Sequence, residues 1–287
     1  MIAIFKREFS SYMRNVTGPL FVAVMLLFGG VFLFVDNLVY GYPKFEYTLN
    51  DLKLVLILAI PVLAMRSLAE DKRSRVDQLL YSLPMSLSQV VIGKYLAMLA
   101  VLGLPCLVMT VYPLIMSFFG AVNYVTAYCA LFAFFMMSAA LLALCMFLSS
   151  LTESQIIAAV IGVAGVLLLF LIDGIAMLVP TQALSSLIAL AVVVLLICLL
   201  LWFMTKNWRI SVIAGVVAIG VLLLLYVINA AMFEGLFAKV VSAMSLFGRF
   251  TRFDDGIFDL GAIVYNLSFI VFFLYLTYQV LEKKRWS

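Results

Sequence analysis

Few side chains in this sequence could carry out chemistry. The chain has no histidine, which is the commonest general base and metal ligand in proteins near neutral pH. Zinc sites of the HExxH type and Ser–His or Cys–His nucleophiles are therefore excluded. The four cysteines lie in apolar stretches without CxxC spacing, which is typical of small buried hydrophobic residues: Cys106, Cys129, Cys145 and Cys198. We expect no enzyme activity, no metal site and no cofactor bound by this chain.

One carboxylate, Asp173, lies deep inside an apolar stretch. Ionisable residues within membrane-spanning segments usually mark a path for a substrate or an ion. Asp173 has no obvious acidic partner, so aspartyl chemistry inside the membrane is not indicated. Its position near the outer end of the predicted span offers a simpler interpretation, in which the carboxylate only meets water. Asp173 is therefore a candidate for the substrate path, with plain hydration as the alternative.

The composition is far more apolar than that of a soluble domain. Hydrophobic residues make up 67% of the 287 residues and charged residues 11%, against roughly half and roughly a quarter in soluble domains. The apolar residues form several blocks, each about long enough to cross a bilayer core of about 30 Å. Because polar and apolar residues do not alternate in these blocks, we predict helices and no β-barrel. The expected fold is all-α, a polytopic transmembrane helical bundle in one domain, residues 1–287.

Eight spans are predicted, and the second is the weakest because it is short and contains Pro61. They are Thr17–Val39, Leu52–Met65, Gly93–Phe119, Tyr128–Ser150, Gln155–Val179, Leu184–Met204, Ser211–Phe233 and Gly261–Leu281. An even number of spans places both termini on one side, and that side then carries 13 of the 18 lysines and arginines. Cytoplasmic loops are enriched in these residues. We therefore expect a multi-pass protein of the cell membrane with both termini in the cytoplasm.

Residues 2–14 precede the first span and form an amphipathic pattern. Apolar and basic side chains fall on opposite faces of a helix, with Ile2, Phe5, Phe9, Tyr12 and Met13 on one and Lys6, Arg7, Ser10 and Arg14 on the other. The pattern predicts a helix lying in the cytoplasmic interface of the membrane. The alternative is an ordinary basic leader in front of a span.

A cytoplasmic loop, residues 66–92, carries the densest charge in the chain. After the charged run, apolar residues follow a helical spacing, Pro84 ends that helix, and Ser86 with Gln89 forms a capping-box signature for the next. A solvated loop would explain the charges but would not need this order, so we predict an amphipathic helix that binds a partner. Its apolar face and basic rim give the candidate contact residues Arg73, Arg75, Val76, Asp77, Leu79, Leu80 and Leu83.

The second large segment between spans, residues 234–260, is predicted on the outer side. Six apolar residues keep a helical spacing there: Phe233, Phe237, Val240, Val241, Met244 and Phe247. This spacing favours an interfacial or re-entrant helix, and the alternative is a plain connecting loop.

Three stretches together resemble the permease subunits of type-2 ABC exporters, most closely the gliding-motility-type branch. They are FKREFSSYMRNVTGPLF at the start, PVLAMRSLAEDKRSRVDQLLYSLPMSLSQVVIGKYLA around the cytoplasmic loop, and FGRFTRFDDGIFDLGAIVYNLSFIVFFLYLTYQVLEKKRWS at the end. The middle of the chain is similar in hydropathy only. Two features depart from the family: Arg75-Val76-Asp77 stands where Gly-Thr and an acidic residue are usual, and an extra pair of spans follows the usual first five.

The resemblance implies an export machine in which two membrane subunits form a path and two ATPase subunits dock on the cytoplasmic loops. This chain has no GxxxxGK[ST] motif, so ATP and magnesium would belong to the ATPase. The expected partners are an ABC ATPase, a second permease copy or a related permease, and membrane lipids, with no nucleic acid. The alternative function is a self-sufficient secondary transporter or channel, which would need several ionisable groups at mid-membrane depth.

Overall fold

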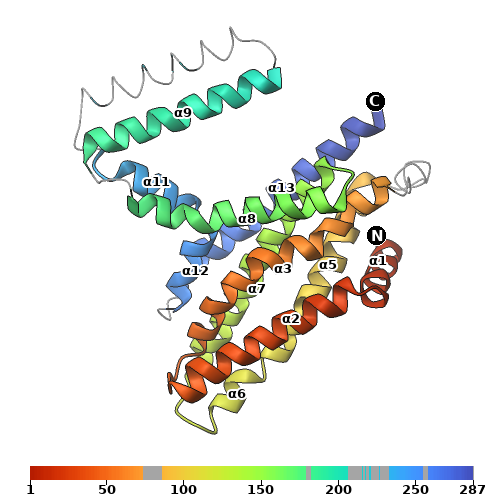
Figure 1. The fold of residues 1–287 in the computed structure, drawn as a ribbon, viewed down its shortest axis with the longest axis vertical. Helices are drawn as coiled ribbons and strands as arrows, with labels where there is room; N and C mark the ends of the chain where they lie inside the picture. Colours follow the sequence, from red (N-terminus) through yellow and green to blue (C-terminus); the bar gives the residue numbers. More distant parts are fainter. Residues whose placement is uncertain are drawn as a thin grey trace. The chain divides into compact units, whose positions relative to one another are not determined.

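A computed structural model describes residues 1–73, 86–178, 182–205, 233–254 and 258–286, with isolated positions 215, 217, 220 and 226. All regular elements within these ranges are helices, as predicted (Figure 1). The chain divides into two compact units, of which unit 1 comprises Met1–Leu168 with Leu246–Ser287 and unit 2 comprises Leu169–Ser245. The helix α8, Gln155–Leu178, contributes to both units.

Six helical stretches of the described residues are long and apolar enough to cross a membrane. They are Thr17–Val39, which joins α2 (Thr17–Phe32) to the π-helix η1 (Leu33–Val39); α3 (Phe45–Arg73); Leu87–Met116, which joins α5 (Leu87–Met109) to α6 (Tyr112–Met116); α7 (Tyr124–Leu151); Gln155–Ile172 of α8; and Leu260–Lys283 of α13 (Leu260–Trp286). The all-α bundle of spanning helices is therefore confirmed, and the first span has the predicted bounds.

The second span is much longer than predicted. Helix α3 begins before Leu52 and continues through Pro61 to Arg73. Proline removes one backbone donor, but Pro61 is buried and packs against Gly162 of α8, where a Cβ would lie 3.0 Å from the Pro61 ring. The charged end of α3 is also held by neighbouring helices. Tertiary packing thus extends a helix that hydropathy alone truncates.

The predicted extra pair of spans falls in unit 2. Helix α9, Ala183–Thr205, matches the first member of the pair, and its described apolar stretch is Ala183–Leu195. Most of the second member, Ser211–Phe233, lies outside the described residues. The total of eight spans stays a prediction.

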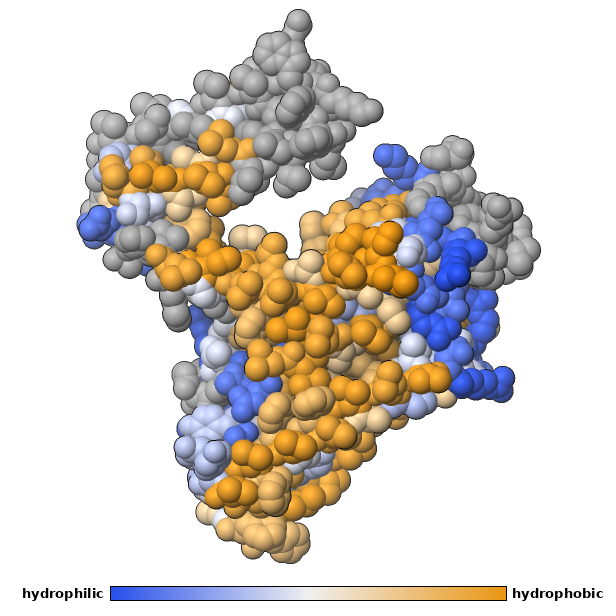
Figure 2. Space-filling model, in the orientation of Figure 1, coloured by the Kyte–Doolittle hydropathy of each residue, from blue (hydrophilic) through white to orange (hydrophobic). Residues whose placement is uncertain are grey.

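The core of unit 1 forms around α3 and α7, which pack directly on each other. Small residues such as Ser138, Ala140 and Ala143 are fully buried on α7, and such residues let membrane helices approach closely. The outward side of the bundle is apolar as well, for example at the exposed Leu54 and Leu58 of α3. Figure 2 shows this apolar surface over unit 1 and a hydrophilic surface at the end where α1 lies.

The amphipathic helix before the first span is present as α1, Ile2–Arg14. Toward the bundle it buries Ile4 and Tyr12, whereas Ile2 is 78% exposed, and its place in the membrane interface stays a prediction. Helix α1 packs against α5, and a Cβ on Gly93 of α5 would lie only 3.1 Å from Ile4. The turn into α2 needs a second glycine, since a Cβ on Gly18 would overlap the carbonyl oxygen of Tyr12.

Segment 234–260 contains two short helices where one was predicted. They are α11 (Leu236–Met244) in unit 2 and α12 (Leu246–Asp254) in unit 1, and the break comes at Ser245, which is extended with φ −70° and ψ 124°. Helix α11 packs against α9 and buries Phe237, but Met244 of the predicted apolar face is exposed. Helix α12 packs against α3 and α7 through buried aromatic residues. The ring centroids of Phe250 in α12 and Phe134 in α7 are 6.2 Å apart. The segment is therefore helical, in two pieces, and its place at the outer interface stays a prediction.

Candidate functional site

The predicted contact residues lie at or beyond the end of α3. Arg73 is the last residue of α3 and is exposed. The other six lie outside the described residues: Arg75, Val76, Asp77, Leu79, Leu80 and Leu83. Asp173 belongs to α8, and its side chain is also outside what the structure describes. The roles of all these residues stay predictions, and the site is built from the helices that lead into and out of residues 74–85.

Ser86 begins the helix that leaves this segment. It is the N-cap residue of α5 and is extended, with φ −72° and ψ 139°, as an N-cap requires. The predicted capping box is wrong, because the Ser86 side chain accepts no hydrogen bond from the backbone of α5. Its hydroxyl accepts a hydrogen bond from Ser88 at 3.2 Å instead. Helix α5 therefore starts where expected, but without the expected capping hydrogen bond to the Ser86 side chain.

A buried lysine joins the three helices at this end of unit 1. Lys94 of α5 is 2% exposed, and its Nζ lies 2.7 Å from Asp71 of α3 and 3.2 Å from Glu8 of α1. It also donates a hydrogen bond of 2.8 Å to the carbonyl oxygen of Ser67. An ammonium group has three donors, and these contacts use all of them. We call Lys94, Asp71 and Glu8 the Lys94 cluster.

Electrostatics keep the Lys94 cluster ionised on the α1 side. Burial alone would raise the pKa of the Glu8 carboxyl, but the charges of Lys94 and Arg7 and their hydrogen bonds outweigh it and lower the pKa below its ordinary value. Arg7 contacts Glu8 at 2.6 Å from the solvent side. A buried charge is tolerated when it is paired and hydrogen-bonded. Removing one member leaves an uncompensated buried charge, which costs about 3–5 kcal/mol.

The end of α3 is fastened to α7 as well. Lys72 is buried and donates a hydrogen bond to the carbonyl oxygen of Ser150, in the last turn of α7, where a cation also favours the helix dipole. The neighbouring Ser149 hydroxyl accepts from the Ala69 amide at 3.3 Å and donates to the Met65 carbonyl at 3.2 Å. The last turns of α3 are therefore held by α1, α5 and α7 together.

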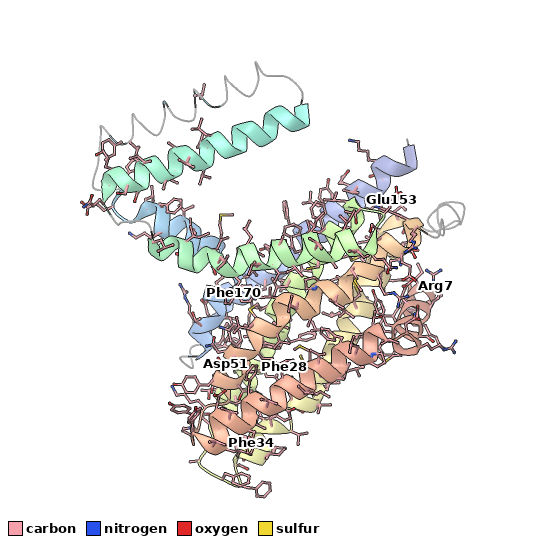
Figure 3. All side chains as sticks on the ribbon, viewed as in Figure 1. Arg7, Phe28, Phe34, Asp51, Glu153 and Phe170 are labelled. Carbon is pink, nitrogen blue, oxygen red and sulfur yellow. The ribbon has the colours of Figure 1, made fainter. Side chains whose placement is uncertain are left out.

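A polar pocket of about 290 Å³ lies beside the Lys94 cluster, between α1 and α3. Its lining includes Arg66, which makes a bidentate pair with Glu70 at 2.7 and 2.8 Å. Tyr12 also lines the pocket and is 5% exposed, and burial, followed by the negative charge of Glu8, raises the pKa of its hydroxyl. The exposed Arg7 of α1 also lines the pocket and is labelled in Figure 3. Water in the pocket can therefore reach Glu8 and Asp71, which line it, whereas Lys94 does not line the pocket and is buried.

The Lys94 cluster connects three helices through ion pairs. Its ionised groups are paired with one another, and the described residues hold no group of three or more His, Cys, Asp or Glu side chains that could bind a metal. The two helices joined by residues 74–85 are linked by the short Asp71–Lys94 contact. Through Glu8, the same lysine also connects these two helices to α1.

A family relationship covers the part of the chain that contains Asp71 and Lys94. The sequence model of the ABC-2 family transporter proteins matches residues 43–192, just over half of the chain. The chain belongs to the ABC-2 transporter family. No curated protein and no solved structure matches it. As an ABC-2 permease, it is a multi-pass membrane component of an ABC transporter, and family membership implies an ABC ATPase as a partner in general.

The matched region of this ABC-2 permease begins at α3 and ends within α9. It includes Asp71, Lys94 and the fastening residue Ser149, whereas Glu8 of α1 precedes it. Sequence reasoning missed the Lys94 cluster. A signal was present, because Lys94 is the single charged residue of α5 in Leu87–Met109, and a lone charge in an apolar helix needs a partner.

Proposed function

We propose that this ABC-2 permease is the membrane-spanning subunit of an ATP-driven exporter and docks a separate ATPase on the segment 74–85. The observation that supports the proposal is the fastening of both helices that flank this segment. Asp71 and Lys94 lie 2.7 Å apart, and Lys72 and Ser149 connect α3 to α7. A stiff base is what conformational work from a partner would need in order to reach the spans.

In this proposal ATP and magnesium bind to the ATPase, and the permease pairs with a second copy of itself or with a related permease. Both termini, α1 and the Lys94 cluster lie on the cytoplasmic side of the cell membrane, in agreement with the surplus of Lys and Arg there. The apolar face of Val76, Leu79, Leu80 and Leu83 fills a groove on the ATPase in the helix-in-groove mode. Arg73 and Arg75 at its rim guide orientation more than affinity. The family assignment favours this function over that of a self-sufficient secondary transporter.

The decisive experiment is copurification from the native membrane, with the bound subunits identified by mass spectrometry. The double variant Leu79→Asp with Leu80→Asp would bury unpaired charge at the contact. We expect it to insert normally in the membrane and to lose the ATPase. The matched control, Lys206→Ala with Arg209→Ala, changes two charged residues elsewhere and should keep it. A double-aspartate variant that retains its ATPase and normal turnover would rule out this segment as the docking element.

A further inference from the structure

A long apolar groove lies between α5 and α7 on unit 1, on the surface of two candidate spans. Its volume is about 920 Å³, and its lining is apolar apart from Thr110 and Tyr128 at one end. Along α5 the lining runs from Leu96 to Thr110, which is about 21 Å at a helical rise of about 1.5 Å per residue. In a bilayer core of about 30 Å, an unfilled groove of this size would be occupied by hydrocarbon.

Aromatic side chains line both ends of the groove. At the Leu96 end, Phe5 and Phe9 of α1 stack on each other, 5.9 Å between ring centroids, and line the groove. At the other end, the Tyr128 hydroxyl donates a hydrogen bond of 3.2 Å to the Thr110 carbonyl and bridges α7 to α5. A spanning helix from a second copy has at least 18 residues, is longer than the groove at about 1.5 Å per residue, and would have to run past the aromatic side chains at both ends. A single acyl chain fits between them, because it ends inside the membrane.

The α1 end of the groove also carries the charge that a lipid head group needs. Lys6 is exposed and makes no ion pair among the described residues. Although the sequence pattern assigns Lys6 to the basic face, it lies four residues after Ile2 and three before Phe9, both of which line the groove, so it is their neighbour at the edge of the apolar face. Cationic side chains at a membrane surface attract anionic lipids. The apolar groove thus matches the acyl chain of a phospholipid, and Lys6 at its α1 end matches the charged head group.

We propose that this groove is a binding site for one anionic glycerophospholipid of the leaflet on the α1 side. One acyl chain lies between α5 and α7 under Phe5 and Phe9, and the phosphate is held by Lys6. The lipid thereby fills the space between α1 and the spans. The proposal needs only that unit 1 crosses a bilayer and does not depend on the ATPase.

The test uses the full chain in phosphatidylcholine vesicles that contain a minority of phosphatidylglycerol with a photoreactive group on its acyl chain. After illumination, mass spectrometry locates the labelled peptides. In the unmodified chain we expect label on the α5 and α7 peptides around Leu104 and Phe132. Gly103 lines the groove, and the nearest atom to a Cβ there is Phe135 Cε2 at 4.0 Å. Gly103→Leu therefore fills the groove without meeting backbone and should lose most of this label.

The matched control is Gly30→Leu on α2, where the nearest atom to a Cβ, the Tyr112 hydroxyl, is 3.9 Å away. It should label like the unmodified chain. Should Gly103→Leu fail to fold, Ala100→Leu fills the same groove from one turn away. Equal labelling of the groove-filling variant and the control would overturn the proposal. A disulfide between two copies of Phe132→Cys would also overturn it, because a second permease would then occupy the groove.

The head group is tested by Lys6→Gln with Arg14→Gln as its control on the same helix. Lys6→Gln should reduce labelling by the phosphatidylglycerol probe several-fold and leave labelling by a photoreactive phosphatidylcholine unchanged. Arg14→Gln should change neither. Equal loss with both probes, or no loss with either, would refute the assignment of the phosphate to Lys6.

Discussion

At the scale of single residues, Lys94 matters most because it is buried and charged. Its three donors are used by Asp71, Glu8 and the Ser67 carbonyl, so substitution removes the cation that the two carboxylates share, although Glu8 keeps its contact with Arg7. Surface ion pairs contribute about 0–1 kcal/mol at most, but an uncompensated buried charge is far more costly. The Lys94 cluster should therefore dominate the effect of charged-residue substitutions at this end of the bundle.

Lys94→Met tests this expectation, since methionine keeps the unbranched shape and removes the charge. We expect a loss of about 3–5 kcal/mol in stability, measured as a lower midpoint of thermal unfolding in detergent. Lys239→Met, at an exposed position of α11, should change stability by less than about 0.5 kcal/mol. Adding Glu8→Gln and Asp71→Asn to Lys94→Met should restore part of the loss. Equal midpoints for the two lysine variants would contradict the importance of the cluster.

The lowered pKa of Glu8 predicts how α1 responds to acid. The contribution of this ion pair is complete above the ordinary glutamate pKa of about 4.3 and is lost as the pH falls through the lowered pKa of the folded protein. Hydrogen exchange of the α1 amides, corrected for its intrinsic pH dependence, should be constant from neutral pH to about 5 and should increase below about 4. Glu8→Gln should remove this acid step. A step that persists unchanged in Glu8→Gln would assign it to another carboxyl group.

At the scale of elements, α1 is positioned by two glycines. Gly93 lets Ile4 approach α5, and Gly18 leaves room for the Tyr12 carbonyl at the turn between α1 and α2. Neither glycine has a positive φ, so both are required by proximity and not by backbone conformation. A side chain at either position would therefore push α1 away from its place in the bundle.

Gly18→Ala should displace α1 from the bundle, because the new Cβ would overlap the carbonyl oxygen of Tyr12. A reporter cysteine, Ile4→Cys, placed in a chain whose native cysteines are replaced by alanine, should resist a water-soluble thiol reagent. It should react rapidly once Gly18→Ala is added. Gly120→Ala has no atom within 4 Å of its Cβ and is the matched control. Continued protection of the reporter in Gly18→Ala would show that the turn can relax.

The junction of α12 and α13 is fixed by an acidic N-cap. Asp259 accepts hydrogen bonds from the amides of Gly261 at 2.8 Å and Ala262 at 3.3 Å, and pairs with Arg252 at 2.8 Å. Burial acts to raise the pKa of Asp259, but these hydrogen bonds and the Arg252 charge outweigh it and lower the pKa. The cap therefore stays ionised at neutral pH. Asp259 thus has a structural role at the start of the last span.

At the scale of the whole molecule, orientation in the membrane is the main open prediction. The charge distribution places both termini in the cytoplasm. Reporter fusions at the C-terminus and at Lys239 should then report opposite sides, and a fusion at Pro43, between η1 and α3, should agree with Lys239. Fusions that all report one side would disprove the eight-span arrangement.

Hydropathy was enough to locate the six candidate spans found among the described residues, because each needs about 20 apolar residues to cross the bilayer core. It failed at α3, where Pro61 and the charged end near Arg73 are tolerated only through contacts with other helices. The lone charge of Lys94 in α5 indicated that it needs a partner, but the sequence did not say which one, since Glu8, Asp71 and Lys94 are far apart in sequence and meet only after three helices pack. The break at Ser245 has no glycine or proline to mark it.

The order of synthesis favours the burial of Lys94. The chain is made from its N-terminus, so Glu8 and Asp71 have already been translated when Lys94 emerges, a few seconds later at about 5–20 residues per second. A lysine that enters a bilayer alone is costly, whereas this one follows both of its carboxylates. A permuted chain with α1 moved to the C-terminal end would keep every final contact of the Lys94 cluster. Its lysine would nevertheless wait, half paired, until the last residues had left the ribosome.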